Sequence, residues 1–405
     1  MASPLLSVAD ALAQILEHAT PLTAVDVPLQ RATGRVLAAD LAARRTQPPA
    51  DMSAMDGYAV RAADVVTVPA QLKVIGEVAA GRPFPRAVGA GEAARIFTGG
   101  VLPDGTDTIV IQENTDRNGD TVTVKSSSAA GRHVRRAGLD FKQGDVLFPR
   151  GHRILARDLA LIAGMNYPAV PVHRAPKVAT FATGDELVPP GTTPGPGQII
   201  FSNGYTLGAM FEADGADVTD LGIVPDRLGE TVAAVRRARA ESADVLVTTG
   251  GASVGEYDLV QKALAAEGMD LLFWKIAMRP GRPLMHGRIG PMHVLGLPGN
   301  PVSSYVCCLL FVLPLLRKLS GRSDIAIETE SARLAIDLPA NDEREDYLRS
   351  KWTLDESGAT VVTPFGVQDS SMMARLSDAN CLAIRAPFAP PAKAGDACAI
   401  VKLAF

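Results

Sequence analysis

Three acidic residues of the second half of the chain follow strand-like runs. Glu186 comes after KVATFAT, Asp226 after ADVTDLGIV, and Asp258 closes the loop that follows DVLV. Carboxylates are ligands that hard cations prefer, and the carboxyl ends of parallel strands share one edge of a sheet. Each Asp also has a structural alternative, Asp226 as a helix N-cap and Asp258 as a first-turn residue that favours the helix dipole. Taken together, the positions of Asp226 and Asp258 at successive strand ends favour a cation site.

A basic loop follows directly in sequence. Residues 183–270 hold fourteen acidic and five basic residues, whereas 271–323 hold seven basic and no acidic ones. Within the second stretch, KIAMRPGRP carries Lys275, Arg279 and Arg282 in a segment that Pro and Gly keep in loop form. Like charges that gather without acids in sequence favour an anionic ligand. The alternative is a set of solvated surface charges.

Two glycine-containing loops also end predicted strands. TTGGASVGEYD carries Gly250, Gly251 and Ser253, so its backbone can approach a ligand and the helix that follows can offer N–H groups to a phosphate. A tight turn capped by Ser253 is the alternative. GLPGNP places Pro298 and Pro301 between an apolar strand and an apolar helix, which fixes the shape of that loop.

Strands that alternate with helices over 176–323 predict a doubly wound α/β domain with a mostly parallel sheet. Short β-branched runs separated by turns predict a β-rich inserted domain over 46–138. The flanking stretches 1–45 and 139–175 are predicted to form one discontinuous mixed domain, in which an amphipathic helix begins after Ser7. Residues 328–405 read as a small all-β, barrel-like domain.

Composition excludes several classes of protein. A net charge of −4 argues against a nucleic-acid binder, and four cysteines in 405 residues are too few for a disulfide framework. We expect buried free thiols in a reducing cytoplasm. No basic segment precedes the N-terminal helix, which is therefore not a signal peptide. The apolar run 305–316 is too short to span a membrane, so we expect a buried helix.

The motifs are more specific in their order than singly. The chain resembles the molybdopterin molybdenumtransferase family (MoeA type, related to the C-terminal domain of gephyrin) over nearly its whole length. The resemblance rests on SAMDGYAV, RIFTGG with LPDGTDTIVIQE, GLDFKQGD, ATGDEL, TTGGASVGEYD, FWKIAMRPGRP and GLPGNPVSS.

The resemblance implies an L-shaped subunit of four domains in a homodimer. It implies a reaction in which adenylylated molybdopterin and molybdate are the substrates, AMP is released in a Mg²⁺-dependent step, and molybdenum stays on the pterin dithiolene. Other molybdenum-cofactor biosynthesis or acceptor proteins are implied as partners, with no nucleic acid and no membrane.

The resemblance also implies roles for individual residues. Molybdate and the pterin phosphate would be bound by Lys275, Arg279, Pro298, Pro301, Arg349 and Ser370. The catalytic carboxylates would be Asp56, Glu186, Asp226 and Asp258, the last three as Mg²⁺ ligands, and the pterin end would lie on Gly250, Gly251 and Ser253. Thr98 and Asp140, with Asp56, would face the cleft from the other subunit. Arg279 stands where many relatives have lysine, which replaces a point charge by a planar fork.

Two other functions stay open at this point. The TGG-bearing domain could adenylylate molybdopterin or bind another nucleotide, and ATP consumption would distinguish that activity. A dimeric scaffold or binding protein is the alternative from a different class.

Overall fold

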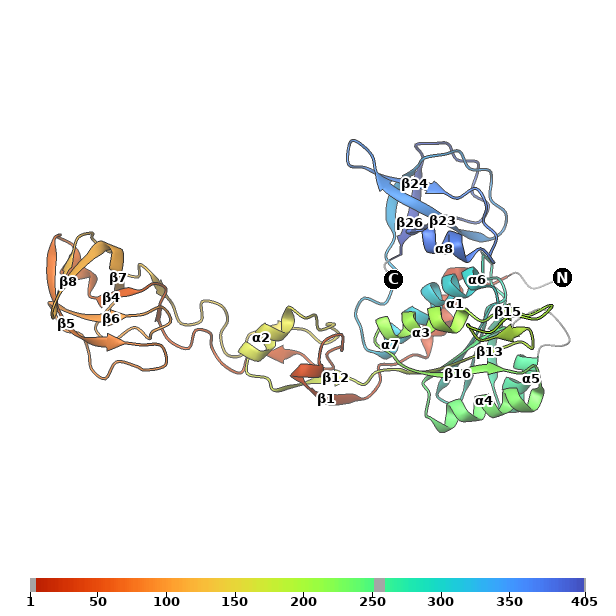
Figure 1. Ribbon diagram of the computed structural model, residues 1–405, viewed down its shortest axis with the longest axis horizontal. Helices are drawn as coiled ribbons and strands as arrows, with labels where there is room; N and C mark the ends of the chain where they lie inside the picture. The colour runs from red at the N-terminus through yellow and green to blue at the C-terminus, as the bar shows by residue number, and fades with distance from the viewer. Residues whose placement is uncertain (1–4, 251–258, 404–405) are drawn as a thin grey trace.

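The computed structural model describes residues 5–250 and 259–403. The chain forms an elongated L (Figure 1). A β-rich domain lies at one end, an arm of small paired strands follows, and an α/β domain at the other end carries a β-barrel on top. The predicted multidomain α/β and β fold is confirmed.

The distal β-rich domain is built on a six-stranded sheet in the order β7-β4-β6-β5-β9-β8. Side chains of β4 alternate between two cores, because Tyr58 and Val60 pack in one cluster and Ala59 in another. The strands of this sheet are β4 (Gly57–Val60), β5 (Ala70–Val78), β6 (Glu92–Ile96), β7 (Thr108–Ile111), β8 (Thr115–Asn118) and β9 (Thr121–Val124).

The arm joins two distant stretches of sequence. One core cluster combines residues of 27–43 with residues of 141–172. Its elements are β1 (Ala24–Pro28) paired with β12 (Ala169–His173), β2 (Leu41–Ala42) paired with β11 (Val146–Phe148), and α2 (Asp158–Gly164). A two-stranded ribbon, β3 (Met52–Ser53) with β10 (Val134–Arg135), packs against the distal domain, where Val134 contacts one of its cores.

The N-terminal helix differs from its predicted place. The predicted cap is confirmed, because Ser7 Oγ accepts the Asp10 N–H at 3.1 Å at the start of α1 (Val8–Glu17). However, Ala11 and Ile15 are buried in the core of the α/β domain rather than in the arm. The physical reason is that the apolar face of α1 needs a large apolar partner, which α7 and η4 supply.

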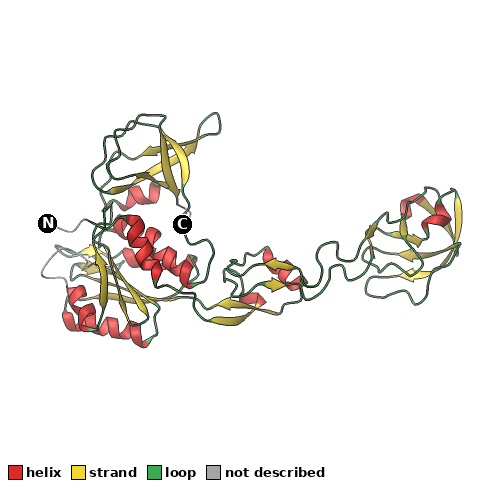
Figure 2. Ribbon diagram, turned by 180° about the vertical axis from the view of Figure 1, so that it is seen from behind, coloured by secondary structure: helices red, strands yellow, loops and turns green. Residues whose placement is uncertain are grey.

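The central sheet of the α/β domain has the order β16-β13-β17-β21-β20-β18. The first four strands are parallel to one another, β20 runs antiparallel to them, and β18 runs antiparallel to β20 and therefore in the direction of the first four. Val245 and Val247 face a core with α1, α3, α6 and α7, whereas Leu246 faces α4 and α5 (Figure 2). The strands are β13 (Lys177–Thr183), β16 (Asp217–Val224), β17 (Val245–Thr249), β18 (Asp270–Trp274), β20 (Met285–Ile289) and β21 (Met292–Leu297). The helices are α3 (Asn203–Ala213), α4 (Leu228–Ala240), α5 (Leu259–Ala266), α6 (Pro301–Cys307) and α7 (Leu313–Leu319).

The helical segment Pro301–Leu319 extends on both sides of the apolar run 305–316. Pro314 does not end it, because the π-helical turn η4 (Cys308–Val312) precedes this residue and accommodates its missing N–H. By length and composition the segment could cross a membrane, but 89% of its most apolar window is buried inside the protein. It is the core helix that the sequence predicted. Cys307 and Cys308 on it are buried and free, as are Cys381 and Cys398.

The C-terminal domain is a closed five-stranded barrel, because β23 pairs with both β24 and β25. Its described strands are β22 (Glu330–Leu334), β23 (Glu345–Leu354), β24 (Thr360–Pro364), β25 (Cys381–Arg385) and β26 (Ala397–Lys402). The barrel is tied to the α/β domain by β19 (Met278–Arg279), which pairs with the start of β23, and by α8 (Met373–Asp378), which contacts α6.

Candidate functional site

The carboxyl ends of the central strands bring two of the predicted loops into contact. Gly250, after β17, has φ +82°, and a Cβ there would lie 2.5 Å from the Thr183 carbonyl oxygen at the end of β13. A Cβ on Gly299, in the GLPGNP loop, would lie 3.7 Å from the Gly250 Cα. Glycine at 250 is therefore required by the close approach of three strand ends, whether or not a ligand binds there.

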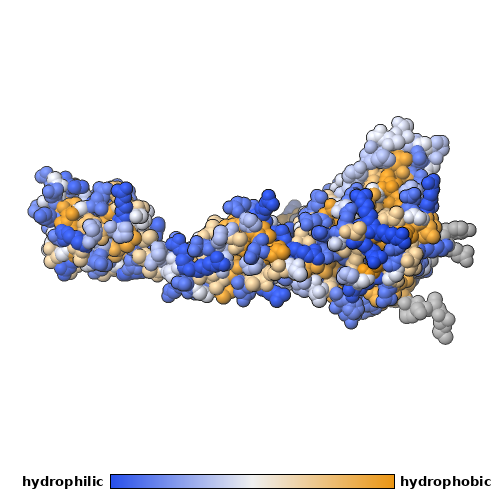
Figure 3. All heavy atoms as spheres, turned by 90° about the horizontal axis from the view of Figure 1, so that it is seen from below, coloured by the Kyte–Doolittle hydropathy of each residue, from blue (hydrophilic) through white to orange (hydrophobic). Residues whose placement is uncertain are grey.

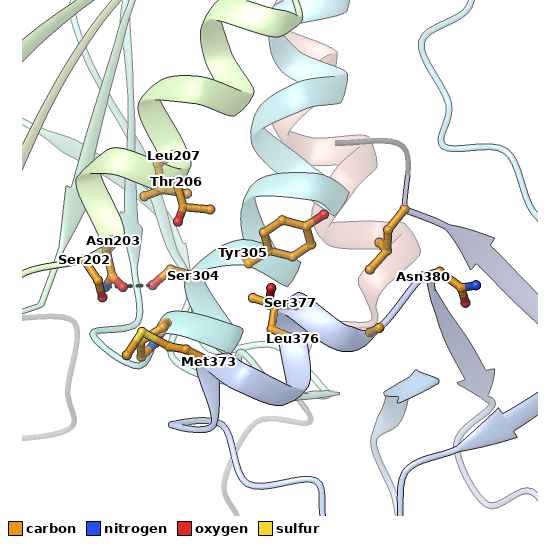
Figure 4. Close-up of a pocket in the computed structure, with 13 residues that line it drawn as sticks. Ser202, Asn203, Thr206, Leu207, Ser304, Tyr305, Met373, Leu376, Ser377 and Asn380 are labelled. Carbon is orange, nitrogen blue, oxygen red and sulfur yellow. Dashed lines mark hydrogen bonds between the residues drawn. The ribbon is translucent and has the colours of Figure 1, made fainter. Parts of the chain in front are cut away.

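A cleft runs from these loops to the barrel. One cavity of about 410 Å³ is lined by Glu186, Gly250 and Pro301, and on the barrel side by Ser371 and Met373. A second cavity of about 390 Å³ shares Ser202, Asn203, Pro301 and Met373 with the first. Figure 4 shows the second cavity between α3, α6 and α8. We call the two together the interdomain cleft.

The walls of the interdomain cleft are partly apolar. Ile199, in the short strand β15 (Ile199–Ile200) that pairs with β14 (Leu187–Val188), is 56% exposed and lines the first cavity. Leu207, Tyr305 and Leu376 line the second (Figure 4). An apolar cleft with a few polar groups at one end suits a flat organic ligand.

One carboxylate lines the cleft, and two more lie on loops that are hydrogen-bonded to each other beside it. Glu186 lines the first cavity, and a Cβ on Gly184 would lie 2.5 Å from its carboxylate oxygen. Asp226 does not cap α4, because the N-cap is Arg227 and makes no side-chain cap. Instead Asp226 Oδ2 accepts the Asp185 N–H at 3.4 Å, and Asp185 Oδ1 accepts the Asp226 N–H at 3.1 Å. Asp185 joins the two loops, and the sequence did not predict this role for it.

The fit to Mg²⁺ can be judged from these carboxylates. No group of three or more potential ligands is preformed in the described ranges 5–250 and 259–403. Glu186, Asp185 and Asp226 are exposed and form no ion pair within those ranges. Mg²⁺ is commonly held by one or two carboxylates together with substrate phosphates and water, so the donor set fits. The predicted residues Gly251, Ser253 and Asp258 lie outside the described residues.

The GLPGNP loop contacts the barrel directly. Asn300 Nδ2 donates to Ser370 Oγ at 2.8 Å, and the Val302 N–H donates to the Ser370 carbonyl oxygen at 3.2 Å. Asn203 Nδ2 donates to the Gly299 carbonyl oxygen at 2.7 Å, which holds the loop from the α3 side. Pro298 is buried behind the loop and does not line the cleft. Asn203 was not predicted; its position at the start of a helix in FSNGYTL was the available signal.

Arg349 is the most deeply buried of the predicted cationic residues, at 1% exposure in β23. Its Nε donates to Gln368 Oε1 at 3.2 Å and its Nη1 to the Met372 carbonyl oxygen at 3.4 Å. Its Nη2 has no hydrogen-bond partner among the described residues. Burial lowers the pKa of the guanidinium, and the charge of Asp369 opposes this shift. The segment that Arg349 contacts continues into Met373 at the wall of the cleft.

The basic loop is less free of acids than its sequence indicates. Arg279 pairs with Asp342 at 3.2 Å and more closely with Asp346, both from the barrel. The prediction that these bases have no acidic neighbours was wrong for Arg279, because its partners lie more than 60 residues further along the chain. Neither Lys275 nor Arg279 lines the interdomain cleft. Whether Arg279 contacts an oxyanion stays a prediction.

Lys275 has an unusual backbone conformation for a residue with a side chain, with φ +75°. Its N–H donates to the Leu284 carbonyl oxygen, and its Nζ lies 4.6 Å from the centre of the Trp274 ring. No ion pair of Lys275 is found within the ranges that the structure describes. A lysine with a strained backbone and no ion pair among the described residues is a candidate for contact with a ligand.

A second group of predicted residues lies far from the cleft. Asp56 precedes β4 in the distal domain, at the opposite end of the molecule from the barrel (Figure 1). Asp56 Oδ1 accepts the Thr98 N–H at 2.7 Å and the Thr98 hydroxyl at 2.8 Å, so the carboxylate links two loops and does not make a local turn. The backbone bond, the hydroxyl bond and the charge of Arg95 lower the pKa of Asp56. Asp140 is exposed in the arm.

The fold and the cleft define a multidomain α/β protein with a ligand cleft between a doubly wound domain and a barrel. Three family models cover almost the whole chain: the MoeA N-terminal region (domain I and II) at 6–165, a probable molybdopterin binding domain at 179–318, and the MoeA C-terminal region (domain IV) at 331–403. The chain belongs to the MoeA-type molybdopterin molybdenumtransferase family.

Individual relatives agree with this membership. The chain is 35% identical over 364 residues to a molybdopterin molybdenumtransferase of Haemophilus influenzae, covering 88% of each chain. It is 36% identical over 373 residues to one of Nostoc sp., covering 88% of this chain and 84% of the relative. A crystal structure of a molybdopterin biosynthesis MoeA protein from Pyrococcus horikosii superposes with a TM-score of 0.85 at 30% identity, covering 98% of this chain and 99% of that one.

Proposed function

We propose that this protein transfers molybdenum from molybdate to adenylylated molybdopterin and releases AMP in a Mg²⁺-dependent step. The observation that carries the proposal is the interdomain cleft, which brings together Glu186, Gly250 and Pro301 from three loops of the α/β domain. Family membership supports the same chemistry. A cytoplasmic location fits the four buried free cysteines.

The two kinds of wall in the cleft suit the two parts of this substrate. The flat pterin would lie against the apolar side chains, and its phosphates would reach toward the strand ends. Gly250 leaves room for the backbone to approach the phosphates. Arg349 Nη2, Ser370 and Lys275, none of which lines the two cavities themselves, would donate to the oxyanions of molybdate and the pterin phosphate.

Glu186 and Asp226 would hold Mg²⁺, with Asp185 fixing the loop of Asp226 and with Asp258 as a further predicted ligand. When bound, the cation supplies positive charge to the pyrophosphate oxygens. The exposed carboxylates leave space for the water that cleaves the phosphoanhydride, giving AMP and a pterin phosphate. Substrate phosphates would complete a ligand set that the chain itself leaves open.

We further propose that the functional unit is a homodimer, which other cofactor-biosynthesis or acceptor proteins would contact. The support is that Asp56, Thr98 and Asp140 cannot reach the cleft of their own chain in this L-shaped arrangement (Figure 1). Mixing Asp56→Asn subunits with Glu186→Gln subunits tests the idea. Recovery of part of the wild-type rate in the mixture would support a shared site, whereas activity no greater than the sum of the two variants would contradict it.

The reaction is tested by incubating the purified protein with adenylylated molybdopterin, Mg²⁺ and molybdate. We expect release of one AMP for each substrate consumed, and loss of that release when Mg²⁺ is chelated. Free molybdopterin with ATP is the matched control, because ATP consumption there would instead indicate an adenylyltransferase. No AMP release under any metal condition would overturn the proposal.

A further inference from the structure

A separate cavity lies at the edge of the central sheet opposite the interdomain cleft. It has a volume of about 520 Å³ and is bordered by the starts of β17 and β21, by the segment after α1 and by the chain entering β13 from the arm. We call it the arginine groove; its charged and imidazole-bearing lining residues are His18, Arg174, Arg239, Asp244, Arg288 and His293. Strands of five to seven residues separate the two sites by about 15–20 Å.

Positive charge exceeds negative charge in the arginine groove. Asp244 is the carboxylate among the lining residues, and it is already occupied, because Arg174 donates to both of its oxygens at 2.6 Å. Asp244 Oδ2 also accepts the Lys177 N–H at 2.8 Å. Arg239 donates to Glu267 at 3.0 Å on the outer side of α4. Figure 3 shows strongly hydrophilic residues on the underside of the α/β domain, where α4 lies.

Arg288 is the lining residue whose charge is left without a partner. In the described ranges it makes neither an ion pair nor a side-chain hydrogen bond, and its Nε is buried without a partner. Asp270 stands opposite Arg288 in the register of β18 and β20, yet no ion pair joins them. A buried guanidinium nitrogen without an acceptor is costly, so an acceptor from outside the chain would be favoured here.

Neighbouring groups respond to the same excess of charge. Burial and the positive charges of Arg288 and His18 together lower the pKa of His293 to about 4, against the opposing effect of Asp244. The cations therefore outweigh the carboxylate at the floor of the groove.

The shape of the groove adds a second requirement for the ligand. Leu22, Ile289 and Leu319 give it an apolar side, and its volume lies in the range of small-molecule sites. Arginine forks match the paired oxygens of a phosphate group better than a single point charge does. We propose that the arginine groove binds a phosphorylated small molecule, with the phosphate on Arg288 and the apolar part against Ile289 and Leu319. This site is independent of molybdenum transfer.

The test uses inorganic pyrophosphate as the probe and isothermal titration calorimetry as the readout, at constant ionic strength and without Mg²⁺. We expect saturable binding to the full-length protein and a dissociation constant about tenfold or more higher for Arg288→Gln. Arg288→Lys, which keeps the charge but not the fork, should give a smaller loss. Arg237→Gln is the matched control, because Arg237 lies on the same domain, pairs with Glu241 and does not line the groove.

Three outcomes would overturn the proposal: no saturable binding by the wild-type protein, equal weakening by Arg237→Gln and Arg288→Gln, or binding that Arg288→Gln retains and Arg349→Met abolishes. The last result would place the probe in the interdomain cleft. Near-ultraviolet circular dichroism of each variant establishes that it is folded before titration. AMP release is measured separately, so failure of the groove and failure of the transfer reaction are distinguishable.

Discussion

Arg322, after α7, and Arg349, in the barrel, are both almost fully buried, at 8% and 1% exposure, but their surroundings differ. Arg322 donates to Asp214 at 2.7 Å and to Asp324 at 2.8 Å. Arg349 contacts an amide oxygen and a carbonyl oxygen, and its Nη2 has no partner among residues 5–250 and 259–403. Burial favours a lower pKa for both guanidinium groups, yet the carboxylates raise the pKa of Arg322 while that of Arg349 is lowered.

This is the difference that we expect between a structural arginine and one that binds a ligand. Arg322 closes a network in which Asp214 also receives Arg317 at 3.2 Å, so its charge is balanced inside the chain. The charge of Arg349 is not balanced in this way, and an anion in the adjoining cleft would balance it. Four experiments test whether buried groups in the two kinds of surroundings differ in their effects on stability and activity.

Replacing Arg322 should cost far more stability than replacing Arg349. Arg322→Met leaves Asp214, whose side chain is 3% exposed, without its shortest ion pair, and the free energy of unfolding should fall by about 3–5 kcal/mol. Arg349→Met removes a poorly satisfied buried charge and should leave that free energy nearly unchanged or raise it. Urea unfolding at pH 7 measures both. Equal losses would remove the distinction between the two arginines.

For catalytic activity we expect a large effect of replacing Arg349, the residue whose replacement should cost little stability. Arg349→Gln should lower kcat/KM for molybdate in AMP release by about 10²–10³-fold, because it removes a preorganised donor to developing negative charge. Steady-state kinetics at saturating Mg²⁺ give the value, with Arg333→Gln on the exposed face of β22 as the control. A loss of less than threefold would argue that an anion does not use Arg349.

His286 and His293 are also buried, and burial favours their uncharged form. His286 and His293 stack at 5.7 Å, and burial lowers their pKa values from 6.5 to about 3 and about 4. Both folded-state values lie below the unfolded one, so the unfolded chain binds protons first, and the stabilisation present above pH 6.5 is lost as the pH falls. We expect the free energy of unfolding to decrease by about 2–3 kcal/mol between pH 6.5 and 5.

Urea unfolding at several pH values checks this dependence. His286→Phe should remove about half of the slope, since it deletes one of the two groups that gain protons on unfolding. His133→Gln, outside the α/β core, should keep the slope. An unchanged slope in His286→Phe would show that other groups cause the pH dependence.

The smallest effect is expected at Arg279. Its side chain is 47% exposed and already paired with Asp342 and Asp346, so Arg279→Lys keeps a charge where the barrel supplies the acids. The rate of AMP release should fall by less than about tenfold. Arg349→Lys, which cannot keep the same set of contacts, is measured in parallel. A larger loss of the AMP-release rate in Arg279→Lys than in Arg349→Lys would indicate that Arg279, and not Arg349, is the residue that the reaction depends on.

Local sequence predicted the loops of the site well. Glu186, Gly250 and Pro301 line one cavity because parallel strands end at a common edge, which the alternation of strands and helices already indicated. The partners of these loops could not be predicted from local sequence. Ser370 reaches Asn300 from another domain, and Asp342 reaches Arg279 across more than 60 residues.

Two other features were not predicted for a similar reason, because both depend on partners that are distant in sequence. The acid-free stretch 271–323 looked unbalanced, but Asp214 and Asp324 neutralise Arg322 in space. The strand β20 was not predicted, because His286 and Arg288 interrupt an apolar pattern that a buried antiparallel strand normally shows. β20 forms because it pairs with β21 and β18, and its local propensity does not indicate a strand.

We expect that an oxyanion balances the buried charge of Arg349. Equilibrium dialysis of radiolabelled molybdate in the presence of AMP and Mg²⁺ tests it on wild-type protein and on Arg349→Met. We expect one molybdate bound per chain, with a dissociation constant at least about tenfold higher in the variant. Equal binding by the two proteins would contradict it.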